Sequence, residues 1–168
     1  MNKKIMFLGV LILTICISIS VVSAEGFEWS FSTSESSNSD GDAITFDNGK
    51  LVIQDIEFSI PDGYKEVDNE KVLGANLDDD DDQGSLKGFK ISADTFKKGN
   101  DIIVVKVVYS DTTEGDYTPD DDAVTKTISN QEGWLTQDDG GVIFTYIKDK
   151  KIVEIVAPDE ETVESVIV

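Results

Sequence analysis

The chain of 168 residues contains no histidine and no arginine, and all 14 of its basic residues are lysines. Without histidine, the sequence lacks the side chain that most often acts as a general base near neutral pH or as a metal ligand. Without arginine, it lacks the planar guanidinium that holds a phosphate or carboxylate through two hydrogen bonds at once. These absences argue against most enzyme chemistry and against phosphate recognition.

Cysteine is also scarce, because Cys16 is the only one and it lies inside an apolar run over residues 5–22. The residues before it lack the small side chain that a lipoprotein signal carries next to its cysteine. If the first segment is removed, the mature chain has neither disulfides nor thiolate chemistry, and cysteine-based zinc sites are excluded. The hydrophobic core must then stabilise the fold without covalent cross-links.

The first 24 residues have the layout of a secretory signal. Lys3 and Lys4 precede the apolar run, and Val22-Ser23-Ala24 offers small residues where a signal peptidase cleaves. Residues 1–24 are therefore predicted to be a signal peptide, and the protein to be secreted or held on the extracellular face of the cell envelope. The alternative is an uncleaved membrane anchor through residues 5–22. Without such an anchor, no membrane insertion of the mature domain is expected.

Acidic residues dominate the rest of the chain. From Glu25 onward 12 lysines face all 34 acidic residues, a formal charge of about −22. Such a charge repels nucleic-acid phosphates and anionic lipid headgroups, so no nucleic acid is expected as a partner. Solubility is the default explanation of the excess, with cation binding and adaptation to high salt as alternatives.

Composition divides the mature chain into two parts. Residues 25–43 are rich in serine and acids and predict a leader or tether. Within it Phe27, Trp29 and Phe31 alternate as one face of a short strand would, so docking on the domain stays an alternative. Residues 44–168 are long enough to bury a core as one domain.

The first half of this domain begins with the strongest hairpin signal, Asn48-Gly49 between two apolar stretches. A second strand is predicted over residues 56–60, ended by turn chemistry at Pro61-Asp62-Gly63. Residues 64–75 have spacing that predicts a short helix.

The second half contains the most β-branched stretch, residues 101–110, which predicts a central strand joined to residues 88–96 by a turn. Residues 118–129 predict a helical turn capped by Thr118. Three strands between residues 132 and 157 predict an antiparallel meander, and residues 158–168 a short amphipathic helix. Together these elements predict an α+β fold: a twisted antiparallel sheet of about seven short strands with two or three short helices packed on one face. A β-sandwich is the alternative.

An unbroken run of five aspartates, residues 78–82, is the one candidate metal site. A helix–loop–helix calcium loop that starts at Asp79 would need glutamate where Lys90 stands, and one that starts at Asp78 would need glycine where Gln83 stands. Neither register fits, so a solvated loop is the leading interpretation, and a weak surface calcium site is the alternative. Its ligands would be Asp78, Asp79, Asp80, Asp81 and Asp82.

Other polar and aromatic features have simpler explanations. The acids at 120–122 suit a helix start, and those at 138–139 suit a hairpin turn. Trp134 and Tyr146 lie on predicted strands, where packing in the core is favoured over a ligand platform. No serine stands in a nucleophile context, and no catalytic or cofactor-binding residue is predicted.

Four stretches resemble a group of small secreted proteins of methanogenic archaea: LVIQDIEFSIPDGYKE, TISNQEGWL, FTYIKDKKIVEIVAP and DEETVESVI. The element F-x-I-P-x-G-Y, residues 58–64, is also similar to the opening of domains related to the photosystem PsbP group. The first resemblance implies secretion and no assigned activity. The second implies an antiparallel sheet flanked by helices, and a fold does not by itself define a function.

The sequence thus predicts a secreted or envelope-associated, non-enzymatic binding or structural domain. Its ligand is unknown, and its partner would be a protein or another envelope component. A weak calcium-binding envelope module is the first alternative. A hydrolase that works through two carboxylates is the second.

Overall fold

The structure is a computed structural model that describes residues 44–77, 88–110, 119, 121–138 and 140–168. The predicted signal, the leader with Phe27, Trp29 and Phe31, and the aspartate run all lie outside the described residues. Among those described, no helix has both the length and the apolar character needed to cross a bilayer.

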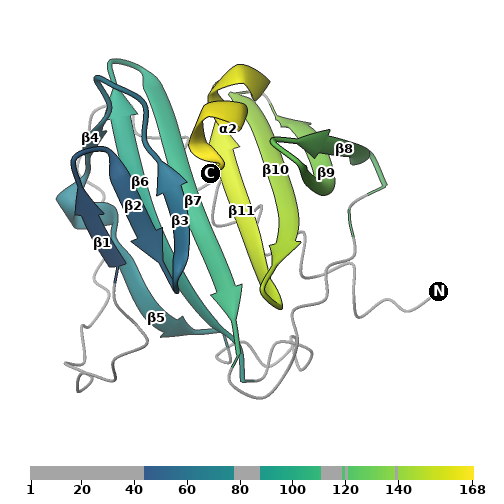
Figure 1. Ribbon diagram of the computed structural model, residues 1–168, viewed down its shortest axis with the longest axis horizontal. Helices are drawn as coiled ribbons and strands as arrows, with labels where there is room; N and C mark the ends of the chain where they lie inside the picture. The colour runs from purple at the N-terminus through teal and green to yellow at the C-terminus, as the bar shows by residue number, and fades with distance from the viewer. Residues whose placement is uncertain (1–43, 78–87, 111–118, 120, 139) are drawn as a thin grey trace.

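Two antiparallel sheets form the domain (Figure 1). The small sheet has the order β1-β2-β3, and the large sheet has the order β4-β6-β7-β11-β10-β9-β8, with β5 also paired to β6. The strands of the small sheet are β1 (Ile44–Asp47), β2 (Lys50–Ile53) and β3 (Ile56–Ser59). Those of the large sheet are β4 (Lys65–Glu66), β5 (Val72–Asn76), β6 (Lys90–Lys98), β7 (Asp101–Tyr109), β8 (Val124–Ile128), β9 (Gln131–Asp138), β10 (Gly141–Lys148) and β11 (Lys151–Ala157).

Tight turns set the register of four hairpins. Both central residues have positive φ in the turns Asn48-Gly49, Gln54-Asp55, Ser129-Asn130 and Asp149-Lys150. Such turns match the right-handed twist of the strands that they join, so two residues suffice for each connection. The hairpin predicted at Asn48-Gly49 is confirmed.

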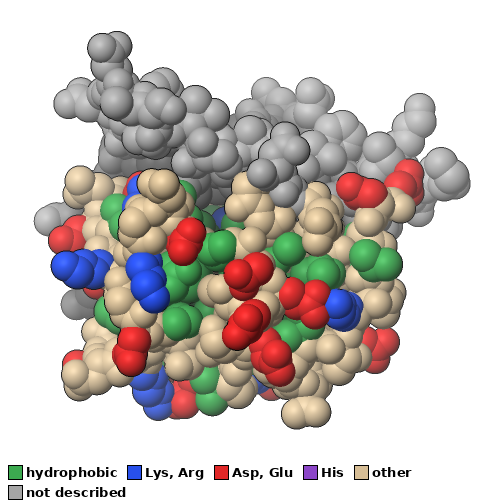
Figure 2. Space-filling view, turned by 90° about the horizontal axis from the view of Figure 1, so that it is seen from above, with side chains coloured by type: hydrophobic (Ala, Val, Ile, Leu, Met, Phe, Trp, Pro, Cys, Tyr) green, Lys and Arg blue, Asp and Glu red, His purple; other side chains and the backbone are tan. Residues whose placement is uncertain are grey.

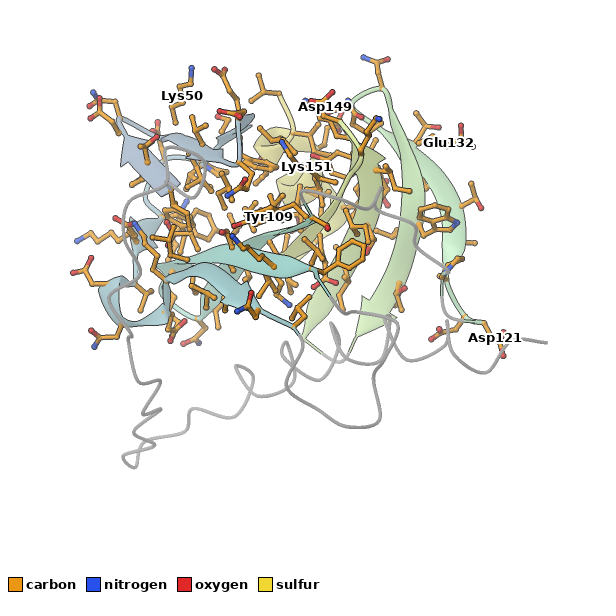
Figure 3. The ribbon with its side chains drawn as sticks, turned by 90° about the horizontal axis from the view of Figure 1, so that it is seen from below. Lys50, Tyr109, Asp121, Glu132, Asp149 and Lys151 are labelled. Carbon is orange, nitrogen blue, oxygen red and sulfur yellow. The ribbon has the colours of Figure 1, made fainter. Side chains whose placement is uncertain are left out.

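The main core lies between the two sheets. On β7, Val105 and Val107 face the small sheet, which contributes Leu51 and Phe58, and all four side chains are fully buried. Burial of one such side chain stabilises the fold by about 1.5–3 kcal/mol. Figure 3 shows the large sheet bending around this core, with Tyr109 in the interior. Lys151 joins the ends of two hairpins, because its Nζ donates to Gln54 O at 2.7 Å.

One α-helix, α2 (Glu160–Val166), packs beside the small sheet and closes the core. Asp159 caps it by accepting a hydrogen bond from Thr162 N, and Val163 and Val166 are buried. The helix predicted within residues 158–168 is therefore confirmed, as are the β6–β7 hairpin and the β9–β10–β11 meander.

The predicted α+β fold is wrong, because the described residues form mostly antiparallel strands with a single α-helix. Residues 64–75 are β4, the short 3-10 helix η1 (Asp68–Glu70) and β5, because the open edge of β6 supplies hydrogen-bond partners. In the stretch 118–129, residues Val124–Ile128 form β8. The alternating β-branched residues of β8 pair with β9. Thr118, the predicted cap of a helical turn, lies outside the described residues.

Candidate functional site

The predicted metal ligands Asp78, Asp79, Asp80, Asp81 and Asp82 lie outside the described residues. Of the second acidic cluster, Asp121 and Asp122 are exposed in a turn before β8, and Asp120 is outside the described residues. Figure 3 places Asp121 at the far end of the large sheet, on the side where β8 lies. Among the described residues, no group of three or more acidic, histidine or cysteine side chains is arranged to hold a metal ion.

Tyr146 belongs to the core, as the sequence predicts. Its ring stacks on Phe144 with 5.6 Å between the ring centroids, and burial raises the pKa of its phenol. Trp134 is half-buried on the opposite face of the large sheet, where it packs beside a small cluster that contains Ile91, Val108 and Ile152. Packing therefore accounts for both aromatic side chains.

A buried ion pair occupies the centre of the large sheet. Lys106 on β7 donates from Nζ to Glu154 Oε1 on β11 at 2.8 Å, and the side chains are only 1% and 4% exposed. These residues face away from the main core, directly opposite each other in the β7–β11 register. The register places them in a row of paired residues across seven strands: Val72, Ala93, Lys106, Glu154, Thr145, Trp134 and Thr125. The pair neutralises itself within this row.

A second charge cluster, which contains the buried Asp94, lies at the edge of the large sheet, where the ladder beside β6 is interrupted. β4 pairs with Phe96 and Lys97, β5 pairs further along β6, and η1 lies between the two short strands. Two polar side chains of β6 supply hydrogen bonds at this interruption. Ser92 Oγ accepts from Gly74 N at 3.0 Å, and Asp94 Oδ1 accepts from Thr95 N at 2.9 Å.

Lys71 holds this edge cluster together. Its Nζ pairs with Glu66 Oε1 on β4 and lies 3.4 Å from Asp94 Oδ2 on β6, whose side chain is 0% exposed. We call these three residues the edge cluster. It places two carboxyl groups against one ammonium group, unlike the pair at Lys106 and Glu154.

The three groups of the edge cluster shift one another's pKa values. Burial raises the pKa of Asp94 to about 6; the charge of Lys71 opposes this shift, and the neighbouring Glu66 carboxyl adds to it. The hydrogen bond from Lys71 lowers the pKa of Glu66. Burial alone would lower the pKa of Lys71, but Glu66 and Asp94 outweigh it and raise the pKa. The two carboxyl groups can therefore share one proton near pH 6.

This arrangement binds protons better than it could bind a substrate. A general acid must reach the proton acceptor of its substrate within about 3 Å. Asp94 is closed from solvent, and Glu66 is turned toward Lys71. A substrate could reach Asp94 only if the sheet edge opened first.

Sequence reasoning missed both buried clusters, although one signal was visible. Lys106 interrupts the apolar run IIVVKVVY, and Glu154 interrupts IVEIVA, with opposite charge. A lone charge in the middle of an apolar strand predicts a buried partner. Asp94 gives a weaker signal, because its stretch also contains Lys90 and Ser92.

No family model matches this chain, and neither the curated proteins nor the solved structures provide a match. The resemblance to small secreted archaeal proteins and to PsbP-like domains therefore stays a prediction.

Proposed function

We propose that this protein is a non-enzymatic binding or structural module that acts outside the cell or on the outer face of the cell envelope. One observation carries the proposal: the charged side chains that are buried among the described residues, Asp94, Lys106 and Glu154, each lie against an opposite charge. These three side chains are at most 4% exposed and have no direct access to a substrate. The secretion pattern of residues 1–24 supports the location.

The outer surface is then the part that meets a partner, and it is acidic. Figure 2 shows acidic side chains gathered in the middle of the face at the end of the molecule where α2 lies. The first turn of α2 carries Glu160 and Glu161, and Glu164 follows one turn later. Of these three acids, Glu160 forms an ion pair with Lys126, with 2.6 Å between Lys126 Nζ and Glu160 Oε2. A partner with positive charge, either a protein or another envelope component, fits this face best.

Cross-linking in cells tests the proposal. The protein is expressed with its own leader and a C-terminal tag, located by fractionation and sequenced from its N-terminus. We expect it outside the cytoplasm with Glu25 as its first residue. We also expect a cross-linked partner that is lost in Glu161→Gln/Glu164→Gln. The matched control is Asp55→Asn/Asp149→Asn, which removes two exposed acids from turns at the other end of the domain.

Two results would contradict the proposal. The first is a cytoplasmic location. The second is hydrolysis of a glycoside, ester or peptide substrate by the wild-type protein, lost in a folded Asp94→Asn or Glu154→Gln variant.

The calcium-binding alternative is separable from the proposal. It predicts a rise in melting temperature with millimolar calcium, absent with magnesium and lost in Asp79→Asn/Asp81→Asn. A non-enzymatic module without a calcium site predicts equal melting temperatures in both salts.

A further inference from the structure

We propose that the edge cluster, Glu66, Lys71 and Asp94, is an acid-tightened latch: uptake of one proton holds β4 and β5 firmly on β6, and its loss loosens this edge of the sheet. The cluster thereby gives the module a pH-dependent surface. The segments involved are residues 65–77 and 90–98, and the latch acts without any partner.

The backbone alone holds this edge weakly. β4 has only two residues, and the pairing of β5 with β6 shifts register between Val72 and Ala75. Between them, Val67 N donates to Thr95 O at 2.9 Å. Because the ladder is short and interrupted, side-chain contacts decide how firmly the segment stays in place. Lys71 makes the contact that links β4 to β6 through Glu66 and Asp94.

Charge balance decides how strong that contact is. When both carboxyl groups are ionised, two negative charges face one positive charge beside the fully buried Asp94, and one charge stays uncompensated. When one proton is shared between Glu66 and Asp94, the cluster is neutral overall. The protonated carboxyl group can then donate a hydrogen bond to the ionised one. Binding of one proton therefore replaces the repulsion between the Glu66 and Asp94 carboxylates with a hydrogen bond between them.

The other charged or titratable groups described around Asp94 leave this balance unchanged. Glu70 on η1 forms its own pair with Lys97 of β6, at 3.2 Å. On β7, Tyr109 lies 3.5 Å from Ser92 Oγ and adds no charge. Lys65 on β4 and Asp68 on η1 are exposed. The residues of β5, Val72–Asn76, include no charged side chain.

The direction of the effect follows from the two carboxyl groups. Because the pKa of Asp94 is raised in the folded protein, its contribution is largest at low pH and is lost as the pH rises through about 6. Because the pKa of Glu66 is lowered, its contribution is present above its ordinary value of 4.5 and is lost only as the pH falls through the lowered pKa. The latch is therefore tightest in the acidic window between these two pKa values.

Hydrogen exchange of the purified protein at pH 5 and pH 7.5, corrected for the intrinsic exchange rate, measures the latch. We expect the amides of residues 65–77 to be about tenfold better protected at pH 5, because this pH lies about one unit below the raised pKa of Asp94, about 6. The amides paired between β10 and β11 are the internal reference and should not change. Equal protection of residues 65–77 at the two pH values would overturn the proposal.

Variants test whether the cluster is responsible. Asp94→Asn keeps an acceptor for Thr95 N and removes the titration, so its protection should not depend on pH. Glu66→Gln should move the midpoint of the transition to lower pH, and Lys71→Met should move it to higher pH. The matched control Glu70→Gln alters the neighbouring pair and should leave the midpoint in place.

Carboxyl-carbon NMR of the wild-type protein follows Asp94 directly and does not depend on any variant. A midpoint between pH 5 and 7 is expected. A midpoint at the ordinary aspartate value, or shifts of Glu66→Gln and Lys71→Met in the same direction, would overturn the proposal.

Discussion

The central ion pair of Lys106 and Glu154 and the edge cluster differ in stoichiometry, in place and in exposure. Lys106 and Glu154 stand one against one in the centre of the large sheet, on strands that are paired on both sides. The edge cluster sets Glu66 and Asp94 against the single Lys71, beside strands with short ladders. A balanced pair gains nothing from a proton, whereas an unbalanced one must either hold an excess charge or bind a proton. We therefore expect the charge of the central pair to stay constant and that of the edge cluster to change with pH.

Removal of one partner from the central pair should have the largest effect. Glu154→Ala leaves Lys106 buried without its carboxylate, and we expect the free energy of unfolding to fall by about 3–5 kcal/mol. Denaturant titration at pH 7 measures the change. The control Lys106→Met/Glu154→Leu removes both charges and keeps the volume, so it should recover most of the loss. Equal destabilisation of the single and the double variant would show that lost packing, and not the loss of the Glu154 carboxylate beside Lys106, is responsible.

Removal of a carboxylate from the edge cluster should instead raise the free energy of unfolding. Asp94→Asn removes the excess charge, and we expect it to be more stable than wild type by about 1–3 kcal/mol at pH 7.5. Because the pKa of Asp94 is raised to about 6, the cost of its ionisation is present above that pH and absent below the ordinary aspartate value. The stability difference should therefore shrink toward zero as the pH falls to 4. Denaturant titrations at four pH values measure it, and a destabilised variant at pH 7.5 would contradict the assigned charge balance.

The parts of the fold that could be predicted are those with local causes. The turn at Asn48-Gly49, the β-branched run of β7 and the amphipathic spacing of α2 act within a few residues, and the elements that they predict are present. The helix predicted over residues 64–75 is wrong because the sequence pattern there suits a helix and a strand about equally. Pairing with the open edge of β6, about twenty residues further along the chain, makes residues 72–76 a strand. A local sequence pattern contains no information about this pairing.

The buried clusters could be predicted in part. Lys106 and Glu154 are each visible as a lone charge in an apolar strand, but they are 48 positions apart. Their pairing requires knowing that β7 and β11 are neighbours and in which register. The edge cluster is harder still, since Asp94 is a common residue in an ordinary strand and its meaning depends on the interruption between β4 and β5.

Asp159, an exposed acid, has a lowered pKa and therefore contrasts with Asp94, whose pKa is raised. Asp159 accepts hydrogen bonds from Thr162 N at 2.8 Å and from Thr162 Oγ1 at 2.7 Å, and these bonds lower its pKa. Its contribution is therefore present above the ordinary aspartate value and lost as the pH falls through the lowered pKa, opposite in sign to that of Asp94. Asp159→Ala should cost about 1 kcal/mol at pH 7, and Asp159→Asn clearly less. Thermal unfolding at pH 7 and pH 3 measures both, and an equal cost at the two pH values would mean that the ionised cap contributes nothing.

The smallest effect is expected where solvent reaches both charges. Lys50 and Glu57 lie on neighbouring strands of the small sheet with Nζ and Oε1 only 2.6 Å apart, closer than Lys106 and Glu154, yet their side chains are 57% and 52% exposed. If distance set the strength of an ion pair, Glu57→Gln would be the more damaging change. Because water screens the exposed pair, we expect a loss below about 0.5 kcal/mol, and less still in 1 M salt. The double variant Lys50→Gln/Glu57→Gln is the control for the single change, and denaturant titration measures both. A loss comparable to that of Glu154→Ala would mean that burial does not separate the two pairs, and the contrast between permanent and responsive charge clusters would then need a different physical basis.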